Sequence, residues 1–197
     1  MLILYIGGDL TAFIVERKDD NVPKTVDVLM SGNGQYGGLG NNLYTTAQGN
    51  PTRVKGISGL LQCEAIFFRK CINRILNSVA DNDRIRALEP VIPEEISISP
   101  TGHVLLALDS SVGVGGRDLM VWGKNYESEL GNGKRGSVAV PTPLATENGE
   151  RFMLMNMKAK EVKDLQGKIW KRGVKVEQKV ATGYGNSAVY WRSSRYN

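Results

Sequence analysis

Two segments of the chain repeat each other, and this repeat limits the possible folds more than any other feature. The first runs from Val28 to Asn41 and reads VLMSGNGQYGGLGN, and the second runs from Met120 to Asn132 and reads MVWGKNYESELGN. They align without a gap from the first glycine to the closing Leu-Gly-Asn, and a Pro-Thr pair follows each one. Such self-similarity predicts a chain built from like units that stack on one another.

A second pattern occurs three times, in residues 5–14, 98–107 and 181–190, and each copy places a turn between two apolar stretches. The two patterns interleave at nearly constant spacing, because 25 residues separate Gly7 from Gly32 and 23 separate Pro100 from Gly123. We therefore predict antiparallel sheets of about four strands. A single sheet of this size cannot bury both faces, so neighbouring sheets must stack, and radial stacking gives a β-propeller.

The repeat also predicts which residues shape the fold. Glycines at repeat positions supply turns with positive φ and allow close backbone approach. Leu39 and Leu130 are expected to fill the gaps between neighbouring sheets, and Trp122 is expected in the core. The full set of expected structural positions is Gly7, Gly32, Leu39, Gly40, Pro51, His103, Trp122, Gly123, Leu130, Gly131, Pro141 and Gly183.

Composition excludes several classes. A hydrophobic fraction of 41% is enough for a packed core and too high for a disordered chain. The longest apolar runs are far shorter than the ~20 residues of a membrane-spanning helix. The first residues read as a strand and lack the features of a secretory signal, which is unusual for a complete protein.

Two stretches interrupt the strand pattern. Residues 58–80, within an insert over 58–88, have apolar side chains at helical spacing and predict an amphipathic helix that packs on the sheets or docks on a partner or membrane. Residues 145–177 form a second insert rich in Met and Lys, where we predict a loop with one short helix near residues 161–170. We treat residues 1–197 as one partial domain that carries both inserts.

The net charge of +5 is concentrated at one end of the chain. Residues 1–149 hold 14 Lys and Arg against 16 Asp and Glu, whereas residues 150–197 hold 11 against 4. A basic region of this kind is either a solvated face or a surface for nucleic acid, anionic lipid or an acidic protein. The sequence leaves these alternatives open.

Motifs for catalysis or cofactor binding are weak. The Gly32-x-Gly34-x-x-Gly37 spacing matches a dinucleotide-binding loop, but a run of turn residues follows it where that motif needs a helix. His103 is the single histidine, and Asp109 is close to it in sequence, but His103 occupies a repeat position where a structural role is expected. We predict no catalytic residues, no metal and no cofactor.

The remaining reactive residue types have ordinary explanations. Cys63 and Cys71 lie eight residues apart in the predicted helix, about 12 Å along its axis, and this is beyond disulfide reach. Two buried thiols are expected. The carboxylate pairs at 19–20 and 94–95 are predicted to lie on solvated loops.

The segment VWGKNYESELGNG, followed by PTPL, resembles the repeat of the regulator of chromosome condensation family. The segments around Gly7, His103 and Gly183 resemble the motif that alternates with this repeat in the family. Ser31 stands where the repeat has tryptophan, Glu129 where it has glutamine, and Pro100 where it has glycine. The resemblance implies a seven-bladed propeller. This chain, with about ten expected strands, is too short to close one, so we expect a piece of a larger propeller with two open sheet edges.

The stretches LMSGNGQYGGLGNN and GYGNSAVYWR further resemble a fungal mitochondrial branch of the family. That branch is placed at the inner membrane and implicated in assembly of respiratory complex III, which implies a non-enzymatic scaffold with protein partners. One alternative is guanine-nucleotide exchange on a small GTPase, the activity of the founding family. Another is RNA or mitoribosome binding through residues 150–197. The sequence does not identify the partner or the loops that bind it.

Overall fold

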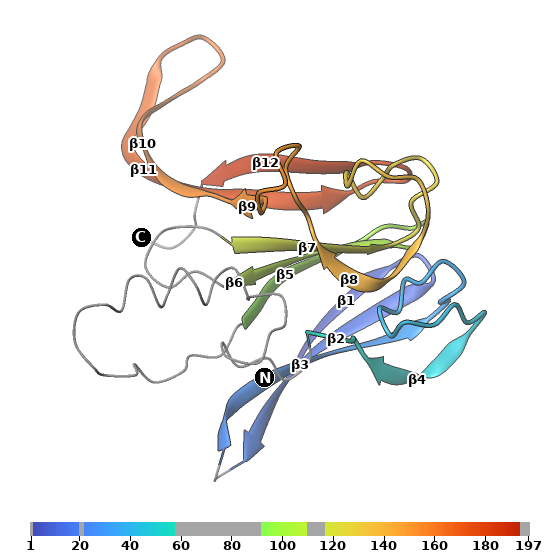
Figure 1. Ribbon diagram of the computed structural model, residues 1–197. Coiled ribbons are helices and arrows are strands. Elements are labelled where there is room, and N and C mark those ends of the chain that lie inside the picture. Colours follow the sequence, from blue (N-terminus) through green and yellow to red (C-terminus); the bar gives the residue numbers. More distant parts are fainter. Residues whose placement is uncertain (1, 20–21, 58–91, 110–116, 194–197) are drawn as a thin grey trace, which may run out of the picture.

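The computed structural model describes residues 2–19, 22–57, 92–109 and 117–193, and in these ranges the chain is all-β and contains no helix (Figure 1). Its twelve strands form three antiparallel sheets. The first sheet contains β1 (Leu2–Gly7), β2 (Leu10–Asp19), β3 (Val22–Gly32) and β4 (Gln48–Arg53). The central sheet contains β5 (Ile92–Ile98), β6 (His103–Asp109), β7 (Arg117–Gly123), β8 (Val138–Pro143) and the short β9 (Met153–Leu154). The third contains β10 (Asn156–Lys163), β11 (Ile169–Thr182) and β12 (Ser187–Ser193).

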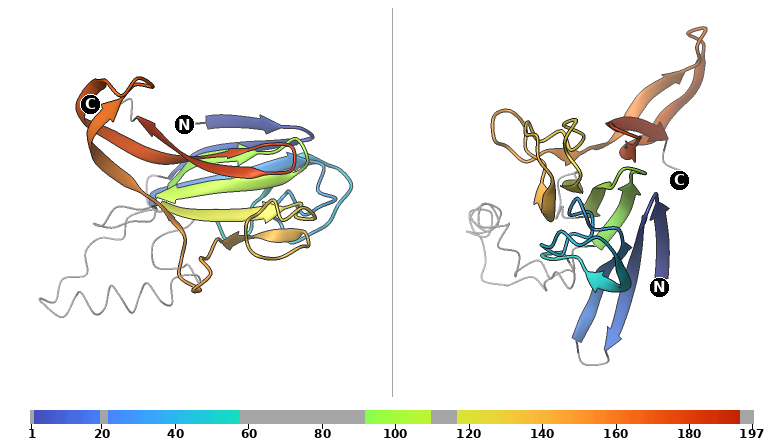
Figure 2. Two further views of the ribbon diagram at one scale, coloured as in Figure 1. Left: turned by 90° about the horizontal axis from the view of Figure 1, so that it is seen from above. Right: turned by 90° about the vertical axis from the view of Figure 1, so that its right-hand side faces the viewer.

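The predicted repeat is visible in the strand register. Leu10 at the start of β2 pairs with Gly32 of β3, and His103 at the start of β6 pairs with Gly123 of β7. β1 packs against β5, and β11 packs against both β5 and β6, so the sheets follow one another side by side (Figure 2). Successive meander sheets stacked in this way form a partial β-propeller, as the sequence predicted.

The central sheet is buried on both faces. Val104 and Leu106 of β6 belong to the core shared with the first sheet, while Leu105 and Ala107 belong to the core shared with Val180 of the third. A strand covered on both sides needs apolar residues on both sides, which explains why β6 is a continuous apolar run without alternation. Burial of a side chain of this size contributes about 1.5–3 kcal/mol.

Leu39 and Leu130 lie where the repeat predicted them. Leu39 is fully buried in the core between the first and central sheets, and Leu130 lies in the core between the central and third sheets. Trp122 is fully buried as well, and its Nε1 donates a hydrogen bond to the Gly38 carbonyl at 2.8 Å. The segment after β3 is thereby fixed to the neighbouring sheet.

The short helix predicted near residues 161–170 is wrong. β10 and the first half of β11 form a hairpin over residues 156–176 that projects from the sheets (Figure 1), and we call it the β10–β11 arm. Its turn is closed by Asp164, whose Oδ1 accepts hydrogen bonds from the backbone N–H groups of Gln166 and Lys168 at 3.0 and 2.8 Å. A side-chain-closed turn of this type reverses the chain and favours a hairpin over a helix.

The described residues form twelve strands, where about ten were predicted, and β9 and β10 lie in the second insert. One smaller prediction needs correction. Asp19 lies at the end of β2, and Glu94 and Glu95 lie within β5, so these carboxylates are on strands and not on loops. The amphipathic helix predicted for residues 58–80, with Cys63 and Cys71, lies outside the described residues.

Among the described residues, no helix is long and apolar enough to span a membrane.

Candidate functional site

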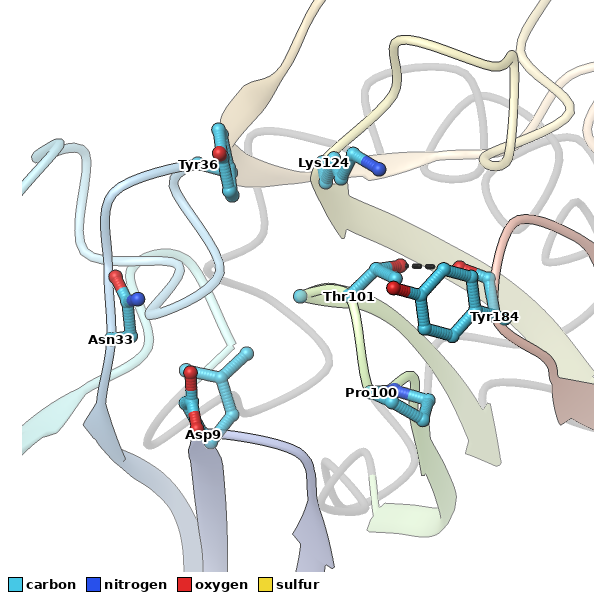
Figure 3. Close-up of a pocket in the computed structure, with 9 residues that line it drawn as sticks. Asp9, Asn33, Tyr36, Pro100, Thr101, Lys124 and Tyr184 are labelled. Atoms are coloured by element: carbon cyan, nitrogen blue, oxygen red, sulfur yellow. Dashed lines mark hydrogen bonds between the residues drawn. The ribbon is translucent and has the colours of Figure 1, made fainter.

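Turns from all three sheets meet at one end of the molecule and enclose a pocket of about 260 Å³, which we call the turn pocket (Figure 3). The β1–β2, β5–β6 and β11–β12 turns contribute Asp9, Thr101 and Tyr184. The segments that follow β3 and β7 contribute Tyr36 and Lys124. Residues far apart in sequence therefore meet at equivalent places of successive repeats.

The repeat glycines allow this convergence. A Cβ atom at Gly32 would overlap the carbonyl oxygen of Asp9, and one at Gly123 would overlap the carbonyl oxygen of Gly102. Both glycines also have positive φ, 115° and 99°. The end of β3 therefore passes directly against the β1–β2 turn, and the end of β7 against the β5–β6 turn. Only glycine allows the two backbones to approach so closely.

The charged groups of the turn pocket are one carboxylate and one ammonium, Asp9 and Lys124. The Lys124 Nζ lies 3.5 Å from Oε1 of Glu129, whose side chain is fully buried. The pocket thus presents mixed polarity. A site of this character suits a polar segment that carries both hydrogen-bond donors and acceptors.

Tyr36 and Tyr184 line the turn pocket, and the exposed Tyr126 contacts Tyr36. The rings of Tyr36 and Tyr126 meet edge to face, with centroids 5.7 Å apart and planes at 86°. Tyr126 is 54% exposed and Tyr184 is 80% exposed. Tyrosine offers a large amphipathic surface with few rotatable bonds, and it is enriched where proteins bind one another.

His103 lies beneath the pocket and is fully buried. Its Nε2 donates to the carbonyl of Asn186 at 3.2 Å, and its Nδ1 lies 3.5 Å from Oγ1 of Thr101, which itself donates to the carbonyl of Tyr184 at 2.7 Å. Burial lowers the pKa of the His103 imidazole below its usual 6.5. His103 therefore joins β6 to the β11–β12 turn in its neutral form.

The structure does not bring Asp109 to His103. Asp109 is exposed at the opposite end of β6, about 20 Å away at ~3.3 Å per residue, so the two cannot form a triad. Among the residues that the structure describes, no group of three or more His, Cys, Asp or Glu side chains has the arrangement of a metal site. Gly32 ends β3, Gly34 and Gly37 lie in the segment that connects it to β4, and no helix follows them there.

The other predicted positions are structural neighbours of the pocket or lie away from it. Gly183 donates from its N–H to the Asn186 carbonyl at 2.8 Å and closes the β11–β12 turn. Gly7 ends β1, where a Cβ would meet the Ile98 backbone. Pro51 is exposed on β4 and Pro141 is buried on β8, and neither lines the pocket.

Sequence reasoning missed Asp9, Tyr36, Lys124 and Tyr184 as site residues. A signal for them exists, because each stands within four residues of a repeat glycine that the sequence did identify. It also missed Arg117, which is 2% exposed and joins all three strands β5, β7 and β11. Its guanidinium lies 2.9 Å from Glu94 Oε2 and donates to the Gln178 carbonyl.

Together these features define an all-β repeat protein whose turns converge on a polar, tyrosine-lined pocket. No protein-family model matches the chain, and no curated protein matches it. Among solved structures, the chain is similar to human WBSCR16 at 13% sequence identity and a TM-score of 0.24, over 98% of this chain and 58% of that one. The chain thus spans less than two thirds of that protein's length, and a likeness at this TM-score carries no argument about function.

Proposed function

We propose that this protein is a non-enzymatic interaction scaffold that binds a segment of a partner protein at the turn pocket. The observation that carries the proposal is the convergence of Asp9, Lys124, the half-buried Tyr36 and the exposed Tyr184 from three sheets. Exposed aromatic side chains around a few polar groups are the usual composition of a binding hot spot. These groups lie on turns and connecting segments that packed strands anchor at both ends, which limits the conformational entropy lost on binding.

The test replaces Tyr184 by a photoreactive amino acid in the full chain, identifies the cross-linked protein, and measures its affinity for variants. Tyr184→Ala should weaken that binding about 30-fold, because a central aromatic contact contributes about 2 kcal/mol. Tyr190→Ala is the matched control, since Tyr190 is 43% exposed on β12 and outside the pocket. Equal affinities of the two variants would refute the turn pocket as the binding site.

We also propose, on the resemblance of the repeat segments alone, that the protein belongs to the regulator of chromosome condensation family and acts in mitochondria as an assembly factor for respiratory complex III. Imaging of the tagged full-length protein and native-gel quantification of complex III after its deletion test this proposal. A location outside mitochondria, or an unchanged complex III, would contradict it.

Guanine-nucleotide exchange remains the alternative prediction. It requires a partner GTPase that releases its nucleotide faster in the presence of this protein. A fluorescent-nucleotide release assay with candidate GTPases separates it from simple scaffolding, because a scaffold binds its partner without accelerating release.

A further inference from the structure

The β10–β11 arm has two faces of different character. Lys158 of β10 stands directly opposite Lys175 of β11 in the strand register. Side chains alternate along a strand and paired residues share a face, so Lys160 and Lys171 project from this side as well. All four are exposed, and we call them the lysine face.

The opposite face is closed by its own contacts. Val174 is buried there and Ala159 is partly buried. Arg172 and Lys163 share the carboxylate of Glu161, at 3.4 and 4.0 Å. Arg172 and Lys163 therefore both have an anionic partner within the arm, and Glu161 balances one of their two positive charges.

The lysine face has no such compensation. Within the described part of the chain, no carboxylate lies within ion-pair distance of the four ammonium groups. Like charges directly opposite each other destabilise a strand pair, so the pairing of Lys158 with Lys175 costs stability in the free protein. A bound anion would offset the repulsion between the Lys158 and Lys175 ammonium groups, because it attracts both.

The backbone also leaves room for a ligand. Gly173 lies between Lys171 and Lys175 on β11, and it presents no side chain. The Lys158 side chain extends over it, since a Cβ placed on Gly173 would lie 3.2 Å from Lys158 Cε. The centre of the lysine face is therefore exposed backbone beside the Lys158 ammonium group.

We propose that the lysine face of the β10–β11 arm binds the phosphate backbone of single-stranded nucleic acid. The lysines are spread over about 13 Å along the arm, at ~3.3 Å per residue, which suits a chain of phosphates that runs along the ribbon. A membrane surface that met the projecting arm at its tip would contact the lysines at one height along the arm and not all four. Trp170 is 66% exposed and stands next to Lys171, where the register of the arm shifts, and an exposed aromatic ring is the kind of surface on which a base stacks.

The test measures fluorescence anisotropy of a labelled RNA of about 20 nucleotides with the full chain over a series of salt concentrations. Each phosphate contact to a single strand contributes a slope of about −0.7 in log K against log salt. The double variant Lys158→Gln/Lys175→Gln should therefore reduce the steepness by about 1.4 and weaken binding about 25-fold at about 0.1 M salt. Its unfolding midpoint should not fall below that of the wild type, because it removes a like-charge pair.

The matched control is Lys134→Gln/Arg135→Gln, which removes the same charge from an exposed loop of the central sheet. It should leave affinity and slope close to those of the wild type. Equal losses in the two double variants would overturn the proposal, because binding would then follow net charge alone. Absence of RNA binding by the wild type would overturn it too. Loss of binding to vesicles of about 30% phosphatidylserine, with RNA binding retained, would assign the lysine face to lipid instead.

Discussion

At the scale of single residues, Gly40 and Gly131 show how one repeat position serves two purposes. Both have φ of 63°, in the left-handed region that favours glycine. A Cβ on Gly40 would lie 2.9 Å from Val54 Cγ1 and 3.1 Å from Trp122 Nε1, whereas one on Gly131 would meet nothing within 4 Å. Both positions need a residue that tolerates a positive φ. Only Gly40 also needs a residue without a side chain, because its neighbours are close.

This difference gives a matched pair of substitutions. Gly131→Ala should cost about 1–2 kcal/mol, the penalty of a left-handed residue with a side chain. Gly40→Ala should cost about 1–3 kcal/mol more, because the added methyl group displaces Val54 or Trp122. Urea unfolding of the two variants measures the difference. Equal costs would show that the core yields freely around Gly40.

His103 links the stability of the fold to pH. Burial lowers its folded pKa below 6.5, so the unfolded chain binds the proton more tightly. The resulting stability is present above about pH 6.5 and is lost as pH falls from there toward the lower folded pKa. Burial raises the pKa of the Glu95 carboxyl, so Glu95 makes stability depend on pH in the opposite direction to His103. The stability linked to Glu95 is lost as pH rises through its folded pKa.

A comparison of the wild type with His103→Gln isolates the histidine, because both proteins contain Glu95. The difference in unfolding free energy between them should rise with pH from about 5 to 7, with a slope of at most about 1.4 kcal/mol per pH unit, and be constant above. Denaturant titrations at several pH values measure it. A difference that does not change with pH would mean that His103 is protonated equally in both states.

At the scale of strands, Arg117 is the buried link between the central and third sheets. It lies on β7, 2.9 Å from Glu94 on β5, and it donates to the Gln178 carbonyl on β11. Ser97 of β5 and Thr182 of β11 add a second link, with their hydroxyl oxygens 3.0 Å apart. The third sheet is thus held on the central sheet by polar contacts as well as by Val180.

Arg117→Met should loosen β11 specifically. It keeps most of the side-chain volume but leaves the Gln178 carbonyl without its charged donor, at a cost of about 2 kcal/mol. Hydrogen exchange should accelerate in β11 and β12 and stay unchanged in β2 and β3. Arg135→Met, on an exposed loop, serves as the control and should have no measurable effect. Uniform acceleration over all three sheets would contradict this role of Arg117.

The sequence predicted the features that appear in its own pattern of repeats and apolar residues, and it did not predict those that depend on contacts between distant segments. The repeat glycines, Leu39 and Leu130 were predictable because they recur at a fixed spacing, and Trp122 was predictable because a large apolar side chain buries well. The β10–β11 arm was not, because its exposed strands follow no burial period and its turn depends on one Asp164 side chain. Arg117 and the turn pocket escaped prediction because their partners come from distant parts of the chain.

At the scale of the whole molecule, each sheet contacts mainly its neighbour in sequence, so stability is a sum over successive interfaces. Leu39 belongs to the interface of the first and central sheets, and Leu130 to that of the central and third sheets. The two are equivalent in the repeat but act on different parts of the molecule.

Leu39→Ala and Leu130→Ala should each cost about 2–5 kcal/mol, the usual penalty for a buried leucine. Their effects should differ in place. Hydrogen exchange should rise most in β1 to β4 for Leu39→Ala and most in β10 to β12 for Leu130→Ala. Identical exchange patterns would show that the three sheets unfold as one cooperative unit.

The length of β11 has a mechanical consequence. Its first half pairs with β10 in the arm, and its second half pairs with β12 and carries Val180 into the core. One continuous backbone therefore spans the projecting arm and the packed interior, with no hinge loop between them. Gly173, with φ of 65°, lies in this strand between Lys171 and Val180, so a force applied near Lys171 reaches the Ser97–Thr182 contact through a strand that can bend at a single residue.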